Sequence, residues 1–174
     1  MLYRIAIVGP ESTGKSVISE QLARHYNTLF VAEYARQCIE QLQREYTLQD
    51  IETIARAQFK NENELARQCN NILICDTNLL VTKIWAEHAF GTCPKFITQH
   101  WKANDYGLHL LMQIDLPWQY DAQREHPHKR NFFFNWYKQE LKSAKANYTI
   151  IEGTEEQRLL NAIAAIDTFL STKN

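Results

Sequence analysis

The sequence has little glycine and proline and no excess of charge of either sign. Five glycines and four prolines among 174 residues exclude collagen-like, low-complexity and disordered chains. Because 45% of the residues are hydrophobic, a chain of this length can bury a core without disulfides or a structural metal. We therefore expect one ordinary ordered domain over residues 1–174.

Positive and negative residues are almost equal in number, so the overall charge gives no reason to expect nucleic-acid binding. Lys and Arg number 19 and Asp and Glu number 20, which gives a net charge of −1. The N-terminal apolar stretch ends after Val8, which is too short for a signal-peptide core or a membrane span. We expect a cytoplasmic protein that takes small-molecule partners, with no nucleic acid and no membrane insertion.

The four cysteines, Cys38, Cys69, Cys75 and Cys93, form no CxxC pair and no His/Cys group with zinc-ligand spacing. A chain of this size does not need a disulfide framework. We therefore expect reduced thiols.

Short apolar runs alternate with longer amphipathic runs, and this pattern predicts an α/β fold with a parallel sheet flanked by helices. The expected strands are 3–8, 28–32, 71–75, 108–114 and 148–151. The expected helices are 16–25, 47–70, 79–89, 94–104, 132–146 and 155–170. The polar segment at about 117–130 contains two prolines and is predicted to be a loop or lid.

The segment from Gly9 to Ser16, GPESTGKS, follows the first expected strand and matches the phosphate-loop pattern G-x-x-x-x-G-K-[ST]. The two glycines let backbone N–H groups point at a polyphosphate, and the N-terminus of the following helix adds positive potential. Lys15 then reaches the β- and γ-phosphates and the Ser16 hydroxyl ligates Mg²⁺. An ordinary glycine turn is the alternative. The expected nucleotide-binding residues are Gly9, Pro10, Glu11, Ser12, Thr13, Gly14, Lys15, Ser16 and Val17.

Other strand ends distinguish a kinase from a GTPase or a motor ATPase. The strings Asn-Lys-x-Asp and Asp-x-x-Gly, which a GTPase usually carries, do not occur. Asp76, after the third expected strand, precedes Thr77 and not the Glu with which a motor ATPase activates water. The sequence therefore favours phosphoryl transfer to an acceptor over hydrolysis.

A small-molecule kinase needs a carboxylate that orients the acceptor hydroxyl. Glu33 directly follows the second expected strand, at the sheet edge where ligands bind in open α/β folds. Arg36 lies about one helical turn further on, so Glu33, Tyr34 and Arg36 are predicted to form a substrate wall. A surface Glu–Arg pair at a helix start is the alternative.

Asp76 is expected to emerge near Ser16 and to hold Mg²⁺ through water, with a helix N-cap as the alternative. Arg124 and Arg130 are expected to close over the phosphates, with a solvated loop as the alternative. Trp118 can offer a flat face to an aromatic, especially cationic, substrate ring, or can be a packing residue.

With these residues together, the sequence resembles the ribosylnicotinamide kinase domain of the NadR family. The similarity rests on Gly9 to Ser16, Glu33-Tyr34-Ala35-Arg36, Asp76-Thr77-Asn78, Asp115-Leu116-Pro117-Trp118 leading to Asp121 and Arg124, and Ile151-Glu152-Gly153 with Glu156 and Arg158. In the lid the family usually has Asp-Gly-x-Arg, where this sequence has DAQR at 121–124. The resemblance does not extend to the family's adenylyltransferase and DNA-binding parts.

The resemblance implies a P-loop kinase fold with a five-stranded parallel sheet. It also implies ATP-dependent phosphorylation of the 5′-hydroxyl of nicotinamide riboside to nicotinamide mononucleotide. ATP and Mg²⁺ are the expected cofactors, with Arg130 and Gly153 added to the nucleotide site. The alternatives are a kinase for thiamine or a deoxynucleoside, and a regulatory module that binds ATP or GTP without transfer.

The expected roles divide the residues into three sets. The catalytic residues are Lys15, Glu33 and Arg124. The acceptor-binding residues are Glu33, Tyr34, Arg36, Asp76, Asn78, Trp118 and Asp121, and the metal-binding residues are Ser16 and Asp76.

Overall fold

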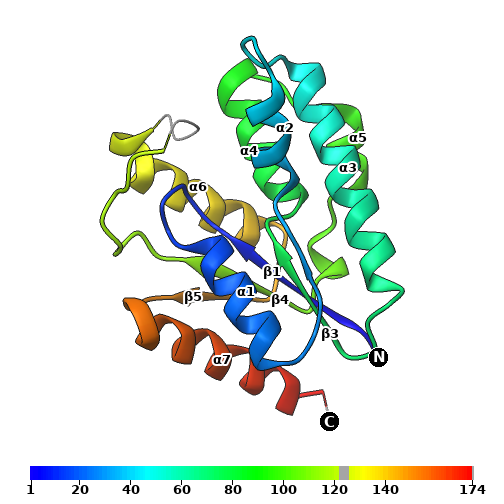
Figure 1. Cartoon of the computed structure of the whole chain (residues 1–174), viewed down its shortest axis with the longest axis vertical. Helices are drawn as coiled ribbons and strands as arrows, with labels where there is room; N and C mark the ends of the chain where they lie inside the picture. Colours follow the sequence, from blue (N-terminus) through cyan, green and yellow to red (C-terminus); the bar gives the residue numbers. More distant parts are fainter. Residues whose placement is uncertain (122–125, 174) are drawn as a thin grey trace.

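The computed structural model of the protein describes residues 1–121 and 126–173. Its centre is one five-stranded sheet with the order β2-β3-β1-β4-β5, in which all neighbouring strands are parallel (Figure 1). The strands are β1 (Tyr3–Val8), β2 (Phe30–Val31), β3 (Ile72–Asp76), β4 (Leu108–Met112) and β5 (Tyr148–Ile151). Ile5 of β1 pairs with Ile74 on one side and with Leu108 on the other. The strand order reverses beside β1, and this is where open α/β sheets bind ligands.

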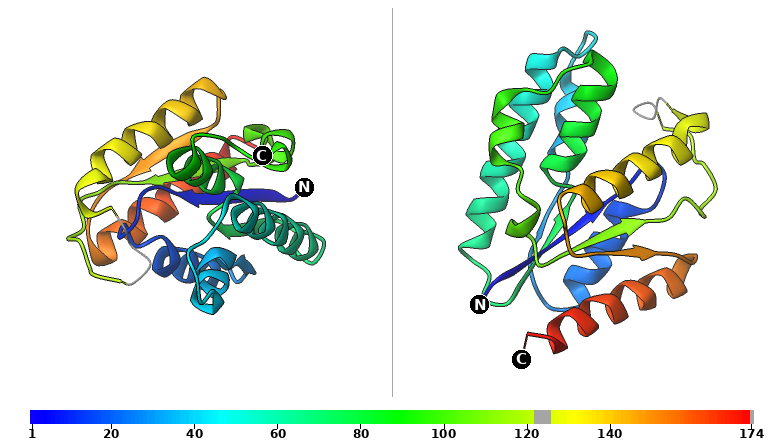
Figure 2. Two further views of the ribbon diagram at one scale, coloured as in Figure 1. Left: turned by 90° about the horizontal axis from the view of Figure 1, so that it is seen from above. Right: turned by 180° about the vertical axis from the view of Figure 1, so that it is seen from behind.

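Helices cover both faces of the sheet (Figure 2). They are α1 (Lys15–His25), α2 (Tyr34–Gln41), α3 (Leu48–Ala66), α4 (Leu79–Phe90), α5 (Lys95–His100), α6 (Arg130–Ser143) and α7 (Glu155–Ser171). The described residues also form two 3₁₀ turns, η1 (Ala103–Asp105) before β4 and η2 (Pro127–Lys129) before α6.

The alternation of side chains along β1 builds two cores. Ile5 and Ile7 pack in one core with residues of α1 and α7. Ala6 and Val8 pack in the opposite core with residues of α4 and α6. Because β1 is buried on both faces, its sequence is a continuous apolar run, as parallel strands require. A third core joins α3, α4 and α5, which stand with α2 at one end of the sheet (Figure 1).

The predicted elements differ from the observed ones mainly at their ends. β2 is shorter than 28–32 because Thr28 leaves the ladder and donates its hydroxyl proton to the Ile72 carbonyl. β4 ends at Met112, two residues before the predicted end. The helix expected at 94–104 divides into α5 and η1, because Trp101 between them has an extended backbone.

Two differences bear on the site. α2 is a helix of its own, which the sequence indicated only as a helix start around Arg36. α6 begins at Arg130, so this residue opens a helix and does not lie inside the predicted loop. Within the residues that the structure describes, none of the helices has the length and apolar character that crossing a bilayer requires.

Candidate active site

The phosphate loop has the backbone conformation that its glycines allow. Gly9 and Gly14 have φ values of 138° and 77°, a region that favours glycine. A Cβ on Gly9 would lie 3.0 Å from the Met112 carbonyl oxygen, so this position is also tightly packed. The Thr13 hydroxyl donates to the Pro10 carbonyl at 2.8 Å and the Lys15 ammonium donates to the same carbonyl at 2.9 Å. The loop is therefore held curled at the N-terminus of α1, where an anion binds most favourably.

The segment after β4 holds this loop from outside. The Gln119 backbone N–H donates to the Ser12 hydroxyl at 2.9 Å. The Arg130 guanidinium donates to the Ser12 carbonyl at 3.0 Å and to the Leu116 carbonyl at 2.9 Å. Arg130 thus braces the phosphate loop through its backbone. Arg124 lies outside the described residues.

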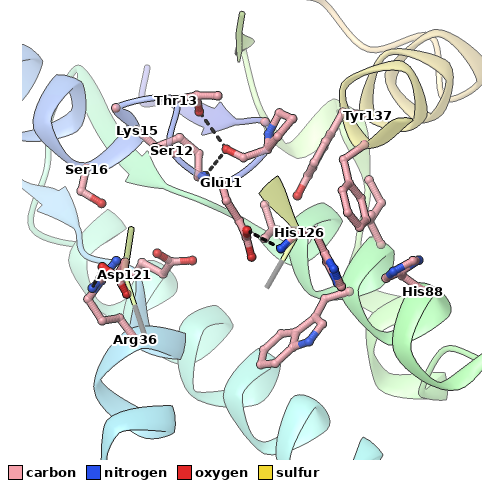
Figure 3. A pocket seen from close by; sticks show the side chains of 18 of the residues that line it. Glu11, Ser12, Thr13, Lys15, Ser16, Arg36, His88, Asp121, His126 and Tyr137 are labelled. Carbon is pink, nitrogen blue, oxygen red and sulfur yellow. Dashed lines mark hydrogen bonds and ion pairs between the residues drawn. The ribbon is translucent and has the colours of Figure 1, made fainter. Parts of the chain in front are cut away.

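A cleft of about 530 Å³ opens beside the phosphate loop, over the carboxyl ends of the strands (Figure 3). Its lining includes the whole loop from Gly9 to Val17. Glu33 and Arg36 line the wall that α2 forms, and Asp121 adds a second carboxylate there. The volume is in the range of small-molecule sites.

The predicted acceptor wall is formed in part. Glu33 is the N-cap residue of α2 and is half-buried at the cleft. Arg36 lies on the first turn of α2 and makes a 2.9 Å ion pair with Asp121, which raises the pKa of the guanidinium. Tyr34 does not line the cleft; its backbone N–H donates to the Gln58 side chain at 2.8 Å. Glu33, Arg36 and Asp121 are therefore together, and Tyr34 is apart.

Asp76 lies at the end of β3, only 2% exposed, and hydrogen-bonds the Ser16 side chain. Burial, followed by the negative charge of Glu33, raises the pKa of Asp76 to about 6, against the lowering effects of Ser16, Lys15 and Arg36. Its Oδ1 atom has no hydrogen-bond partner among the described residues. A buried carboxylate with an unused oxygen beside a hydroxyl fits a hard divalent cation, so Ser16 and Asp76 suit Mg²⁺.

Asn78 has a local structural role. Its Oδ1 accepts from the Leu80 backbone N–H at 3.0 Å and caps α4. It is buried and does not line the cleft. The N-cap considered for Asp76 is therefore supplied by Asn78, two residues later.

Aromatic side chains form the wall of the cleft opposite Lys15, and the sequence analysis missed them. They are Tyr46, Trp85, Phe133 and Tyr137, with His88 and His126 beside them. The rings of Tyr46 and Trp85 meet edge to face at 4.9 Å. Trp118, the aromatic platform expected from the sequence, does not line this cleft. On α4 the spacing Val81, Ile84, Trp85 and His88 was a usable signal, because these positions share one helical face.

Gly153 lies in a network that ties β5 to the end of β4. Its N–H donates to Asp115 at 2.7 Å, and the Arg158 guanidinium donates to the Gly153 carbonyl at 2.8 Å. Arg158 is only 2% exposed and also contacts Asp115 and the carbonyls of Ile151 and Gln113. The network fixes the exits of two strands next to the phosphate loop.

Comparisons with known proteins extend these observations. A family model described as an AAA domain matches residues 4–158. The trifunctional NAD biosynthesis/regulator protein NadR of Escherichia coli (strain K12) is 25% identical over 126 residues, which are 69% of this chain and 30% of that protein. NadR of Salmonella typhimurium matches over the same shares. The chain thus spans about 30% of the length of these curated relatives.

Solved structures share the fold. A NadR protein in complex with NR has a TM-score of 0.75 at 21% identity, covering 96% of this chain and 49% of that one. A NadR protein with NAD and AMP-PNP has a TM-score of 0.72 at the same identity and coverage. Thymidylate kinase from Ehrlichia chaffeensis has a TM-score of 0.66 at 15% identity and covers 96% of this chain and 98% of that one. The chain belongs to the AAA-domain family that matches residues 4–158, and its fold is that of the P-loop kinases.

Proposed function

We propose that the protein transfers the γ-phosphoryl group of ATP to the 5′-hydroxyl of nicotinamide riboside and so forms nicotinamide mononucleotide. The observation that carries this proposal is that Glu33 lines the same cleft as Lys15 and the phosphate loop. A carboxylate facing a phosphate site has no use in a pure nucleotide switch, whereas an acceptor hydroxyl needs it.

In the proposed reaction the loop N–H groups and the N-terminus of α1 hold the polyphosphate, and Lys15 exchanges its contact with Pro10 for phosphate oxygens. Glu33 accepts the proton of the acceptor hydroxyl. The acceptor oxygen then bonds to the γ-phosphorus while the bond to the β–γ bridging oxygen breaks, and ADP leaves. Arg124 is proposed to stabilise the transferring group.

Ser16 and Asp76 would hold Mg²⁺. When bound, the ion neutralises charge on the β- and γ-phosphate oxygens. Asp76 is suited to this role because its carboxylate is buried and its Oδ1 atom has no hydrogen-bond partner among the described residues.

Two observations support nicotinamide riboside as the acceptor. The aromatic wall of Tyr46, Trp85, Phe133 and Tyr137 offers flat faces to a heteroaromatic ring. In addition, the curated relatives are NAD biosynthesis proteins, and one structure with the same fold contains NR. The proposal also includes Asp121 as an acceptor contact and Gly153 as a neighbour of the nucleotide base.

An assay of ADP formation over a panel of acceptors tests the proposal. The panel contains nicotinamide riboside, thiamine, thymidine and deoxyadenosine, and we expect stimulation by nicotinamide riboside. Glu33→Gln should lower kcat by about a hundredfold, a typical value for loss of a general base, while the Kd of ATP stays within about twofold. Glu20→Gln, an exposed carboxylate on α1, is the matched control.

The outcomes separate the parts of the proposal. No stimulation by any acceptor refutes the kinase, and stimulation by a different acceptor refutes only the substrate. If Glu33→Gln weakens ATP binding as much as turnover, Glu33 belongs to the nucleotide side.

A further inference from the structure

The helix α2 carries Glu33 at its start, yet little packing holds this helix in place. None of its eight residues is buried, and a helix this short gains its stability mainly from packing. Its N-cap residue, Glu33, makes no side-chain hydrogen bond to the backbone of the helix. The first turn of α2 therefore needs a partner from elsewhere, because the N–H groups at a helix start have no acceptor within the helix.

Gln58 of α3 is such a partner. The helix α3 lies beside α2 and contacts β2 and β3 (Figure 1). The Gln58 Oε1 atom accepts from the Tyr34 backbone N–H at 2.8 Å, and Tyr34 is the first residue of α2. Neighbouring turns of α3 bury Ile51 and Ala55 in the third core. The hydrogen bond thus connects a helix with no buried residue to a well-packed one.

Gln58 is not needed to fill the core. It is 3% exposed and lies on the face of α3 that buries Ile51, Ile54 and Ala55. Its Nε2 atom has no hydrogen-bond partner among the described residues. Burial of an amide with one half unpaired costs free energy that an apolar side chain of the same length would avoid. The contact between Oε1 and the start of α2 is therefore what an amide supplies at this position.

The Glu33 carboxylate is left free by this arrangement. It lines the cleft and forms no hydrogen bond or ion pair with the described part of the chain. The positive potential of a helix N-terminus attracts a carboxylate. Because Gln58 binds the N–H of Tyr34, and Arg36 is paired with Asp121 at 2.9 Å, a donor next to Glu33 and the arginine of α2 are already engaged.

We propose that Gln58 is a positioning residue of the phosphoryl transfer: by binding the first N–H of α2 it fixes the start of this helix and holds the Glu33 carboxylate unpaired at the cleft. This inference rests on the proposed function, in which Glu33 accepts the proton of the acceptor hydroxyl. Without the Gln58 oxygen, the start of α2 can shift, and the Glu33 carboxylate can turn back toward the N–H groups of its own helix. A displacement of about 1 Å in a reacting group can lower the rate by about a hundredfold.

Gln58→Met tests this role, because methionine keeps the length of the side chain and removes the oxygen. With nicotinamide riboside as acceptor we expect kcat to fall at least about tenfold, while the calorimetric Kd of ATP changes by less than about twofold. Gln58→Glu keeps an oxygen at the same place, and burial favours its neutral form, so its kcat should stay within about threefold of that of the unaltered protein. Gln49→Met, the same substitution at an exposed position on the first turn of α3, is the control and should leave kcat unchanged.

A double-mutant cycle with Glu33 separates positioning from a purely structural role. The effects of two residues that act as a unit do not add. In Glu33→Gln, the further change Gln58→Met should therefore lower kcat by less than about twofold. A purely structural role predicts the same loss in both backgrounds, and this result overturns the inference. A kcat of Gln58→Met within about twofold of that of the unaltered protein also overturns it.

Amide hydrogen exchange, followed by NMR spectroscopy, tests the contact in the unaltered protein. Tyr34 and Leu48 are the first residues of α2 and α3, positions whose N–H groups have no acceptor within their own helix. We expect the Tyr34 amide to be protected at least about tenfold more than the Leu48 amide, and we expect Gln58→Met to remove this difference. Equal protection of the two amides in the unaltered protein overturns the inference, also where Gln58→Met does not fold.

The exchange measurement also distinguishes failure of the inference from failure of the proposed function. If the unaltered protein phosphorylates none of the acceptors in the panel, the proposed function fails, and exchange alone decides whether Gln58 holds the start of α2. Protection of Tyr34 that Gln58→Met removes then supports this contact, and protection that Gln58→Met leaves unchanged overturns it.

Discussion

Replacement of Arg158 by methionine should destabilise the protein by about 3 kcal/mol. The guanidinium is 2% exposed and donates to the Gly153 carbonyl at 2.8 Å, to that of Gln113 at 3.1 Å and to that of Ile151 at 3.3 Å, besides its ion pair with Asp115. Hydrogen bonds of a charged group contribute about 1.5–3 kcal/mol each. Relief of the guanidinium's burial, which lowers its pKa, offsets part of this sum.

Urea unfolding followed by circular dichroism measures the effect. With an m value of about 2 kcal/mol/M, the midpoint should fall by about 1.5 M. Arg24→Met is the control, because Arg24 is 79% exposed and its pair with Glu20 should contribute less than about 0.5 kcal/mol. If Arg158→Met unfolds at the same urea concentration as Arg24→Met, the network around Arg158 does not hold the strand ends.

Three further predictions concern titration and the loop. The pKa of Asp76 is about 6 in the folded protein, above its unfolded value, so ionisation of Asp76 lowers the stability of the fold as the pH rises through 6. In urea unfolding without divalent ions, Asp76→Asn should therefore be about 2 kcal/mol more stable than the unaltered protein at pH 8 and equally stable at pH 3. An Asp76→Asn variant that is less stable than the unaltered protein at pH 8 contradicts this prediction. Burial lowers the pKa of His109 to about 4, so the stability that neutral His109 provides above pH 6.5 is lost as the pH falls toward 4. In His109→Gln the urea midpoint should therefore depend less on pH over this range. An unchanged dependence of the midpoint on pH refutes a lowered pKa of His109. Gly9→Ala brings a Cβ to 3.0 Å from the Met112 carbonyl and should weaken ATP binding at least about tenfold by calorimetry, whereas Gly91→Ala, with nothing within 4 Å, should leave it unchanged.

Features that depend on local backbone geometry could be predicted from the sequence. The spacing of Gly9, Gly14 and Lys15 fixes the curl of the phosphate loop, because the positive φ values require glycine there. The start of α3 is a local feature of the same kind, because Thr47 and Asp50 form a capping box: the Thr47 hydroxyl accepts from the Asp50 N–H at 3.3 Å, and the Asp50 carboxylate accepts from the Thr47 N–H at 2.7 Å.

Features that depend on how helices meet could not be read from the sequence. Trp85 and Tyr137 are far apart in the sequence and line one cleft because α4 and α6 cover the same face of the sheet. Tyr46, which lies between α2 and α3, joins them through its ring contact with Trp85. The sequence named Arg36 and Asp121 separately, but their pairing needs α2 to face the segment after β4. For the same reason the sequence pointed to Trp118 as the aromatic residue of the site, whereas the aromatic residues that line the cleft are those of the aromatic wall.

The central claim is the transfer of a phosphoryl group between two small molecules bound in the cleft. It is tested most directly by following radiolabelled γ-phosphate from ATP in the presence of nicotinamide riboside and Mg²⁺, with the product identified by mass spectrometry. The account predicts label on the 5′-oxygen of the riboside with the unaltered protein, and its loss in Lys15→Ala and Glu33→Gln. Label that appears only as inorganic phosphate, or transfer by Glu33→Gln at an unaltered rate, would contradict the account.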